Sequence, residues 1–193
     1  RLPWTEADVG FLQGMIAHHA QAIAMSRLAP TRDASPAVRT LAARIASAQR
    51  DEIALMRQWL RDRGRDTPEP DTTLAAQGAA AGAPPAGGHG THGGHGAHGS
   101  HGSHADMPGM LTPAQLAELD RARGVEFDVR FLELMIQHHK GAVAMTRALF
   151  STPGAGQDLT VSRLAMDVRV DQTTEVARMQ RMLLQLRLGI ATP

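Results

Sequence analysis

Residues 8–29, DVGFLQGMIAHHAQAIAMSRLA, align without a gap to residues 128–149, DVRFLELMIQHHKGAVAMTRAL. Of the 22 aligned positions, 12 are identical at a constant offset of 120. The similarity continues at an offset of 123, through Leu41/Leu164, Gln49/Gln172, Glu52/Glu175, Met56/Met179 and Leu60/Leu183. The chain therefore contains an internal repeat, and each copy has two elements joined by a loop.

Helix signals mark both elements of each copy, and strand signals are absent. Thr5 is a good N-cap with Asp8 at the third helical position, and Ser35-Pro36 and Thr112-Pro113 are typical helix starts. We expect a first helix from Thr5 to Pro30, a second from Pro36 to Gly64, a short one from Pro113 to Gly124, and two more over residues 126–149 and 159–188.

The predicted fold is all-α. The loops within each copy are short, so each copy should form an antiparallel αα-hairpin, and two hairpins bury their apolar stripes best as a four-helix bundle. Three segments follow from the composition: a first hairpin over residues 1–66, a linker over residues 67–106, and a short helix with the second hairpin over residues 107–193.

The predicted linker is rich in Pro, Ala and Gly and ends in a tract of histidines spaced three apart. Because residues 87–104 contain no apolar side chain larger than Ala, we expect the linker to be disordered. Six imidazoles on a flexible chain can chelate Cu(II), zinc or nickel, although an expression tag or passive spacer has the same composition. These linker residues are His89, His92, His95, His98, His101 and His104.

Composition excludes several classes of function. The net charge is +1 and aromatic residues make up 3%, so a nucleic-acid partner is not expected. No run of about 18 apolar residues could span a membrane. The absence of cysteine excludes disulfides and thiolate metal sites, and it fits an oxidising compartment. The chain begins at Arg1, and we expect a removed signal peptide, with a cloned fragment as the alternative.

The paired histidines fall on the predicted core-facing side of the first helix. At about 100° per residue, His18 and His19 share an arc with Met15 and Met25, whereas Gln13, Ala17, Gln21 and Arg27 take the opposite side. Folding the second helix back should bring Gln49 and Glu52 within about a turn of Met15. Each hairpin is therefore predicted to gather Met, His, Gln and Glu at one level of the interior.

A buried histidine is usually a hydrogen-bonded core residue, and a buried methionine usually fills a gap. The repeat favours a metal site instead, because both copies keep the histidines while neighbours drift, Ala17 to Gln137 and Ala20 to Lys140. Imidazole with thioether and no cysteine favours copper, Cu(I) above all, with Cu(II) also accommodated. No Glu or Asp stands three residues before either His pair, which argues against a di-iron centre.

The stretches FLQGMIAHHAQAIAM, FLELMIQHHKGAVAM, QRDEIALM, QTTEVARM and MPGMLTPAQL resemble the family catalogued as domain of unknown function 305. The resemblance covers both repeat copies and not the linker. It implies a ferritin-like four-helix bundle, export to the periplasm or cell exterior, and copper binding with copper tolerance. Carried over by position, it implies the ligands Met15, His18, His19, Met25, Met135, His138, His139 and Met145.

Further ligands or supporting residues are expected among Gln49, Glu52, Met56, Gln172, Glu175 and Met179. The predicted function is an exported, secreted, periplasmic or cell-surface protein that sequesters or shuttles copper without catalysis of its own. Its predicted partners are metal ions and a copper-accepting or copper-exporting protein. Two alternatives stay open: a helical bundle that binds haem or another redox cofactor, and an interaction module in which only the His tract binds metal.

Overall fold

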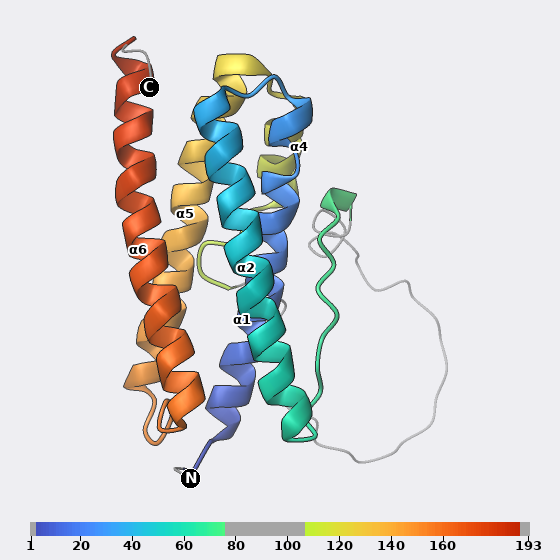
Figure 1. Ribbon diagram of the computed structural model, residues 1–193, viewed down its shortest axis with the longest axis vertical. Coiled ribbons are helices and arrows are strands. Elements are labelled where there is room, and N and C mark those ends of the chain that lie inside the picture. The colour runs from blue at the N-terminus through green and yellow to red at the C-terminus, as the bar shows by residue number, and fades with distance from the viewer. Residues whose placement is uncertain (1–2, 76–106, 190–193) are drawn as a thin grey trace, which may run out of the picture.

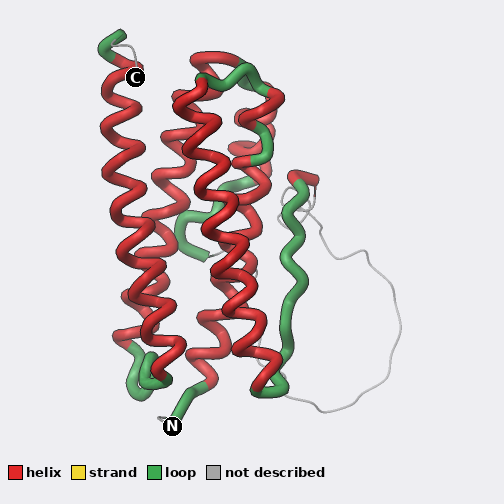
Figure 2. Tube along the Cα trace, in the orientation of Figure 1, coloured by secondary structure: helices red, strands yellow, loops and turns green. Residues whose placement is uncertain are grey.

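The computed structural model describes residues 3–75 and 107–189. Within these ranges the chain forms helices and no strand (Figure 2), as the sequence predicts. The α-helices are α1 (Glu6–Ser26), α2 (Pro36–Asp62), α4 (Pro113–Arg121), α5 (Gly124–Ser151) and α6 (Leu159–Arg187), and η1 (Ala29–Thr31) is a short 3-10 helix.

The four long helices lie side by side (Figure 1). The α1 helix packs against α2, and α5 packs against α6, so each repeat copy is a hairpin. The two hairpins meet through α1 and α5, which run in opposite directions (Figure 1). The first helices of the two copies therefore form the central seam of the molecule, and the paired histidines lie on both sides of it.

Local capping explains where these helices begin. The Thr5 backbone N–H donates to Asp8 Oδ2 at 2.7 Å, as expected for a capping box, and Val38 N donates to Ser35 Oγ at 3.3 Å. The end of α1 differs from the prediction: it stops at Ser26, and Pro30 belongs to η1. Since proline lacks an N–H, it fits the first turn of this separate short helix better than the interior of α1.

Two buried aspartates tie the hairpins to each other. Asp8 Oδ1 accepts from the backbone N–H of Gly156 at 2.7 Å, in the loop that precedes α6. Asp128, its counterpart in the second copy, accepts from the N–H of Ser35 at 3.1 and 3.2 Å, just before α2. Each first helix thus holds the loop of the opposite hairpin, and the interaction is repeated with the sequence.

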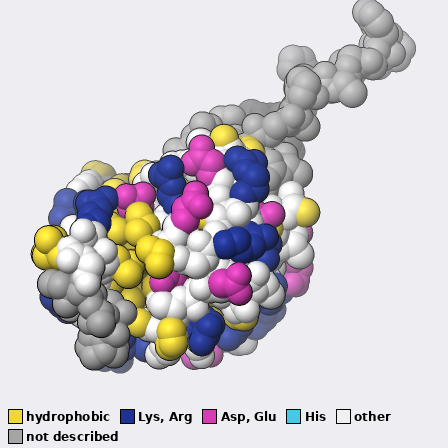
Figure 3. Space-filling model, turned by 90° about the horizontal axis from the view of Figure 1, so that it is seen from above, with side chains coloured by type: hydrophobic (Ala, Val, Ile, Leu, Met, Phe, Trp, Pro, Cys, Tyr) yellow, Lys and Arg dark blue, Asp and Glu magenta, His cyan; other side chains and the backbone are white. Residues whose placement is uncertain are grey.

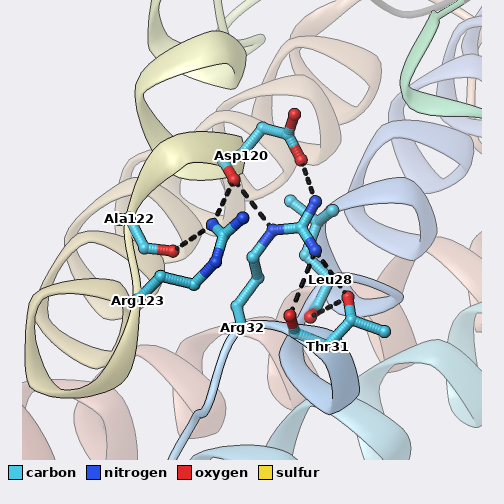
Figure 4. A network of polar contacts seen from close by, with 6 residues as sticks. All are labelled: Leu28, Thr31, Arg32, Asp120, Ala122 and Arg123. Atoms are coloured by element: carbon cyan, nitrogen blue, oxygen red, sulfur yellow. Dashed lines mark hydrogen bonds and ion pairs between the residues drawn. The ribbon is translucent and has the colours of Figure 1, made fainter.

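An arginine network joins the loop after α1 to the end of α4 (Figure 4). Arg32 Nε donates to the Asp120 carbonyl at 2.8 Å, and its guanidinium forms an ion pair with the Asp120 carboxylate. Arg123 donates to the same Asp120 carbonyl at 2.6 Å and to that of Ala122 at 2.8 Å. The short helix α4 is therefore anchored to the first hairpin as well as to α5.

Part of the segment predicted as linker is described, and it packs on the first hairpin. Arg27 Nη1 donates to the Thr72 carbonyl at 3.1 Å, and Arg57 forms an ion pair with Glu69. The chain thus leaves the hairpin later than the predicted boundary at residue 67. The expected disorder of the remaining linker, with its six histidines, concerns residues outside those the structure describes.

The end-on view of the surface shows basic and acidic side chains interspersed (Figure 3). The mixed signs on this end of the molecule agree with the net charge of +1. Among the described helices, none has the length and apolar character needed to cross a membrane.

Candidate metal centre

The imidazoles of His18 and His138 lie in contact at the seam between α1 and α5. Their ring centroids are 3.8 Å apart, with 39° between the ring planes. Both side chains are fully buried, as are those of His19 and His139. The antiparallel packing of α1 on α5 brings these equivalent positions of the two copies together at one point in the interior.

The neighbouring histidines each pair with a glutamate of their own hairpin. His19 Nε2 lies 2.5 Å from Glu52 Oε2, and His139 Nε2 lies 2.7 Å from Glu175 Oε2. The sequence predicted both glutamates as supporting residues, close to the level of the histidines. A carboxylate on one ring nitrogen orients an imidazole and leaves its other nitrogen available to a metal.

His18 is oriented by a backbone carbonyl from the start of the second copy. Its Nε2 lies 3.0 Å from the carbonyl oxygen of Pro108. Because a carbonyl only accepts, the Nε2 atom carries the proton in this hydrogen bond. Burial, reinforced by the neighbouring His19, lowers the pKa of His18 to about 3. The ring is therefore neutral at physiological pH, and its Nδ1 holds a free lone pair.

The pKa of His138 is also lowered well below its usual value, first by burial and then by the adjacent His18 and His139. Its two ring nitrogens have no hydrogen-bond partner in the structure. Transition metals bind the neutral form of an imidazole, because the ligand nitrogen must be unprotonated.

Unpartnered nitrogens are concentrated in this cluster. The Nδ1 atoms of His18, His19, His138 and His139 are all buried without a hydrogen bond, and so is Nε2 of His138. A buried polar atom without a partner destabilises a fold by about 1–3 kcal/mol, and such atoms are rare in native proteins. Five of them around one seam indicate a site whose partner is a ligand rather than a protein group.

The segment Met107–Leu111 closes one side of the cluster. A β-carbon on Gly141 would lie 2.0 Å from the Pro108 oxygen, so only glycine permits this segment to reach α5. On α1, Gln21 donates to the Leu111 carbonyl at 3.3 Å and accepts from its N–H at 2.8 Å. Gln21 was predicted on the solvent side of the first helix, and that prediction is wrong because this segment covers it.

Met107 joins Met145 beside the cluster. A β-carbon on Gly14 would lie 3.2 Å from Met107 Sδ and 3.4 Å from Met145 Cε, so two methionine side chains converge over one point of α1. Met107 was not among the predicted ligands. Its sequence signal is the MPGM stretch, in which a methionine directly precedes the Pro108 that contacts His18.

The other methionines gather only in part hairpin by hairpin, because Met25 and Met145 each join the cluster of the opposite copy. Met15 and Met56 belong to one buried cluster, with Met145 packed against it, whereas Met25, Met135 and Met179 belong to another. Met15 and Met25 are ten residues apart, or about 15 Å along a helix, so one hairpin cannot bring both to a single level. Antiparallel packing instead brings each close to methionines of the other copy.

Glutamines and charged residues line the other side of the cluster, between α2 and α6. Gln49 and Gln172 are buried, and the side-chain oxygens of both are unpartnered. Among the described residues, no three His, Asp or Glu side chains converge as a complete metal centre. The candidate donors are instead paired, His18 with His138, His19 with Glu52 and His139 with Glu175.

Fold and site together define a class: all-helical proteins with a duplicated hairpin and a buried histidine cluster flanked by methionine and glutamate. The family model described as domain of unknown function (DUF305) matches residues 8–183. The chain belongs to this DUF305 family, as the sequence resemblance indicated. A search of the curated proteins found no match.

Solved structures of similar fold include other members of the family. A DUF305 fragment from Deinococcus radiodurans is 31% identical with a TM-score of 0.68, covering 95% of this chain and 99% of that one. A DUF305 protein from Streptomyces coelicolor is 26% identical with a TM-score of 0.70, covering 97% and 96%. CopM in its Cu(II)-bound form is 25% identical with a TM-score of 0.63, covering 92% and 96%.

Proposed function

We propose that this protein is an exported copper-binding protein that sequesters or shuttles the metal through the histidine cluster at the α1–α5 seam. The observation that carries the proposal is the set of buried, unpartnered imidazole nitrogens of His18, His19, His138 and His139. Unpartnered ring nitrogens, on imidazoles that carboxylates and a carbonyl hold in place, are prepared to bind a metal ion.

Copper is the metal that the donor set favours. Imidazole together with thioether, in a chain without cysteine, suits Cu(I) and accommodates Cu(II). The similarity to CopM supports this choice, because structures of that protein hold Cu(I), Cu(II) or silver. Silver(I) resembles Cu(I) in its preference for soft ligands and serves as a probe that air does not oxidise.

The methionines Met15, Met25, Met135 and Met145 would supply thioether sulfur from the two clusters that flank the histidines. Gln49, Glu52, Gln172 and Glu175 would act as supporting or additional ligands. The six histidines of the linker would capture Cu(II), zinc or nickel before or beside the bundle. The proposal includes no catalysis, since its chemistry ends with binding and release.

The ferritin-like four-helix bundle belongs to the same proposal. Two antiparallel hairpins that meet through their first helices support it, together with the burial of the four histidines. Export is supported by the description of the Streptomyces coelicolor relative as a candidate secreted protein. An exported copper carrier would pass its ion to a copper-accepting or copper-exporting protein.

The contact between His18 and His138 disfavours the haem alternative. With the two ring centroids 3.8 Å apart, a porphyrin could not enter between them without separation of α1 from α5. The protein as purified should therefore show no Soret band. The remaining alternative, metal bound only by the linker, is decided by the experiment that follows.

The test compares two full-length variants in competition with a Cu(I) chelator. The first replaces His18, His19, His138 and His139 with Gln, and we expect it to lose tight Cu(I) and Ag(I) binding. The second replaces the six linker histidines with Gln, and we expect it to keep that binding and lose weak Ni(II) equivalents. Both should be purified without a nickel column. Loss of tight binding in the second variant alone would establish the linker as the metal site and contradict our proposal.

A further inference from the structure

A cleft between α2 and α6 leads from solvent to the two histidine–glutamate pairs. Its volume is about 160 Å³, and it is lined by Arg44, Ala48, Gln49, Glu52, Asp171, Gln172 and Glu175. The two helices belong to different hairpins, and in Figure 1 both lie on the side of the molecule nearer the viewer. The cleft is thus on the opposite helices from the Met107–Leu111 segment, which contacts α1 and α5.

Exposure decreases stepwise along this cleft. Asp171 and Arg44 lie exposed at its mouth. The side chains of Glu52 and Glu175 are 14% and 10% exposed, while those of their partners His19 and His139 are 0% exposed. The glutamates therefore connect two environments, with one carboxylate edge toward the cleft and the other on an imidazole.

Unpartnered amide groups lie between the mouth and the histidines. Gln49 and Gln172 are each 2% exposed and both line the cleft. Gln49 has neither amide atom hydrogen-bonded, and the Gln172 oxygen is also without a partner. Buried amide oxygens without donors are suited to a cation that passes or pauses beside them.

The charges that line the cleft favour a cation. Three carboxylates, Glu52, Asp171 and Glu175, face one guanidinium, that of Arg44, so the lining carries a formal charge of 1 − 3 = −2. Arg44 lies 4.0 Å from Glu175 Oε1 and is 58% exposed, so it can move away without loss of packing. A cleft of one sign with low-dielectric walls concentrates counter-ions and raises their association rate.

We infer that the α2–α6 cleft is the route by which the metal ion reaches and leaves the buried histidines. In this mechanism Asp171 attracts the ion at the mouth, Gln49 and Gln172 supply oxygen ligands on the way, and Glu52 and Glu175 deliver it to His19 and His139. Arg44 opposes the approach while it stays beside Glu175. The inference rests on the proposed histidine site and adds its access route.

Charge variants at the mouth test the route through kinetics. The background is full-length protein with the six linker histidines replaced by Gln, so that only the bundle binds. Association of Ag(I) and of Cu(II) is followed by stopped-flow quenching of Trp4 and Trp59 fluorescence at low ionic strength. Asp171→Asn should slow Ag(I) by about threefold and Cu(II) by about tenfold, because the lost attraction scales with ionic charge. Arg44→Gln should accelerate the association of Ag(I) and of Cu(II) by the same two factors.

Matched controls carry the same charge changes on exposed residues of α4. Glu118→Gln and Arg121→Gln should leave both association rates within about twofold of the parent, because neither residue lines the cleft. A steric variant removes the dependence on charge. Ala48→Phe, at an exposed helical position of the lining, should slow association and dissociation of both ions alike and leave the equilibrium affinity unchanged.

The outcomes separate this inference from the proposed function. If tight binding survives the replacement of the four bundle histidines with Gln, the proposed site itself is wrong. Tight binding at the histidines, with rates unaltered by Asp171→Asn, Arg44→Gln and Ala48→Phe, would overturn only the route. Equal slowing of Ag(I) and Cu(II) by Asp171→Asn would likewise contradict steering by charge.

Discussion

The carbonyl oxygen of Pro108 fills the space in which a β-carbon on Gly141 would lie, 2.0 Å away. Gly141→Ala should therefore displace the Met107–Leu111 segment from α5 and break the hydrogen bond between His18 and Pro108. We expect a loss of about 1–3 kcal/mol in the free energy of unfolding, measured by urea denaturation of the metal-free protein. The atoms that a β-carbon on Gly141 would meet belong to the backbone of Pro108 and Gly109, so they cannot move aside as a flexible side chain would.

Gly10→Ala is the matched control for this prediction. Gly10 also lies within a helix, but a β-carbon there would meet nothing within 4 Å. The substitution should raise stability by about 0.5–1 kcal/mol, through the better helix propensity of alanine. Equal effects of the two substitutions would contradict a steric role for Gly141.

Stability of the metal-free protein should fall as the pH is lowered below about 6.5. Burial depresses the folded-state pKa of His18 to about 3 and lowers that of His138 as well, whereas both titrate near 6.5 when unfolded. The unfolded chain then binds more protons, so stability is complete above the unfolded pKa and is lost as the pH falls toward the folded pKa. Each of the two histidines can contribute a slope of up to about 1.4 kcal/mol per pH unit.

The measurement is urea unfolding from about pH 7.5 to about pH 5, above the range in which most carboxylates titrate. His18→Gln and His138→Gln should each flatten the curve, since each removes one buried titrating ring. Parallel curves for the parent and these variants would show that the two imidazoles do not govern its acid stability.

The two glutamates should matter equally for metal binding. Glu52→Gln and Glu175→Gln keep the shape of the side chain but remove the charge that orients His19 or His139. Loss of such an orienting partner typically weakens metal affinity by about tenfold to 100-fold. Competition titration with Ag(I) would measure it, with the exposed Glu126→Gln as the control. An unchanged affinity would mean that these carboxylates serve only to satisfy a buried histidine.

The paired aspartates Asp8 and Asp128 should be of similar importance for stability. Asp128→Asn replaces one of two oxygens that accept from the Ser35 N–H with an amide donor. Asp8→Asn replaces either the oxygen that accepts from Gly156 or the one that accepts from Thr5. We expect each to lower the free energy of unfolding by about 1–3 kcal/mol. The exposed Asp51→Asn should change it by less than about 0.5 kcal/mol in the same denaturation experiment.

Most of the helical structure could be predicted because its signals are local. Capping residues and prolines specify helix starts, and the repeat shows which segments form a hairpin. The pairing of Glu52 with His19 also lay within reach, since a short loop sets the register of an antiparallel hairpin. These features need only the chain on either side of one turn.

The contact of His18 with His138 could not be predicted in this way. It depends on how two hairpins 120 residues apart dock, and no local pattern encodes that register. The prediction that Gln21 is exposed failed for the same reason. Gln21 lies on the polar side of the first helix, and it is buried only because residues 107–111 return to cover it. Met25 and Met145 joined the clusters of the opposite copy because the antiparallel packing of α1 on α5 decides their neighbours.

The Met107–Leu111 segment crosses the seam of a duplicated molecule once. An internal repeat gives two nearly equal halves, but a single segment that crosses between them cannot make the same contacts with both. His18 donates to the Pro108 carbonyl, whereas its twin His138 has no hydrogen bond, and Gln21 meets this segment where its twin position is Gly141. Two imidazoles that are interchangeable in the sequence pattern are thus inequivalent in the folded protein, and their resonances should respond to a first metal ion at different points of a titration.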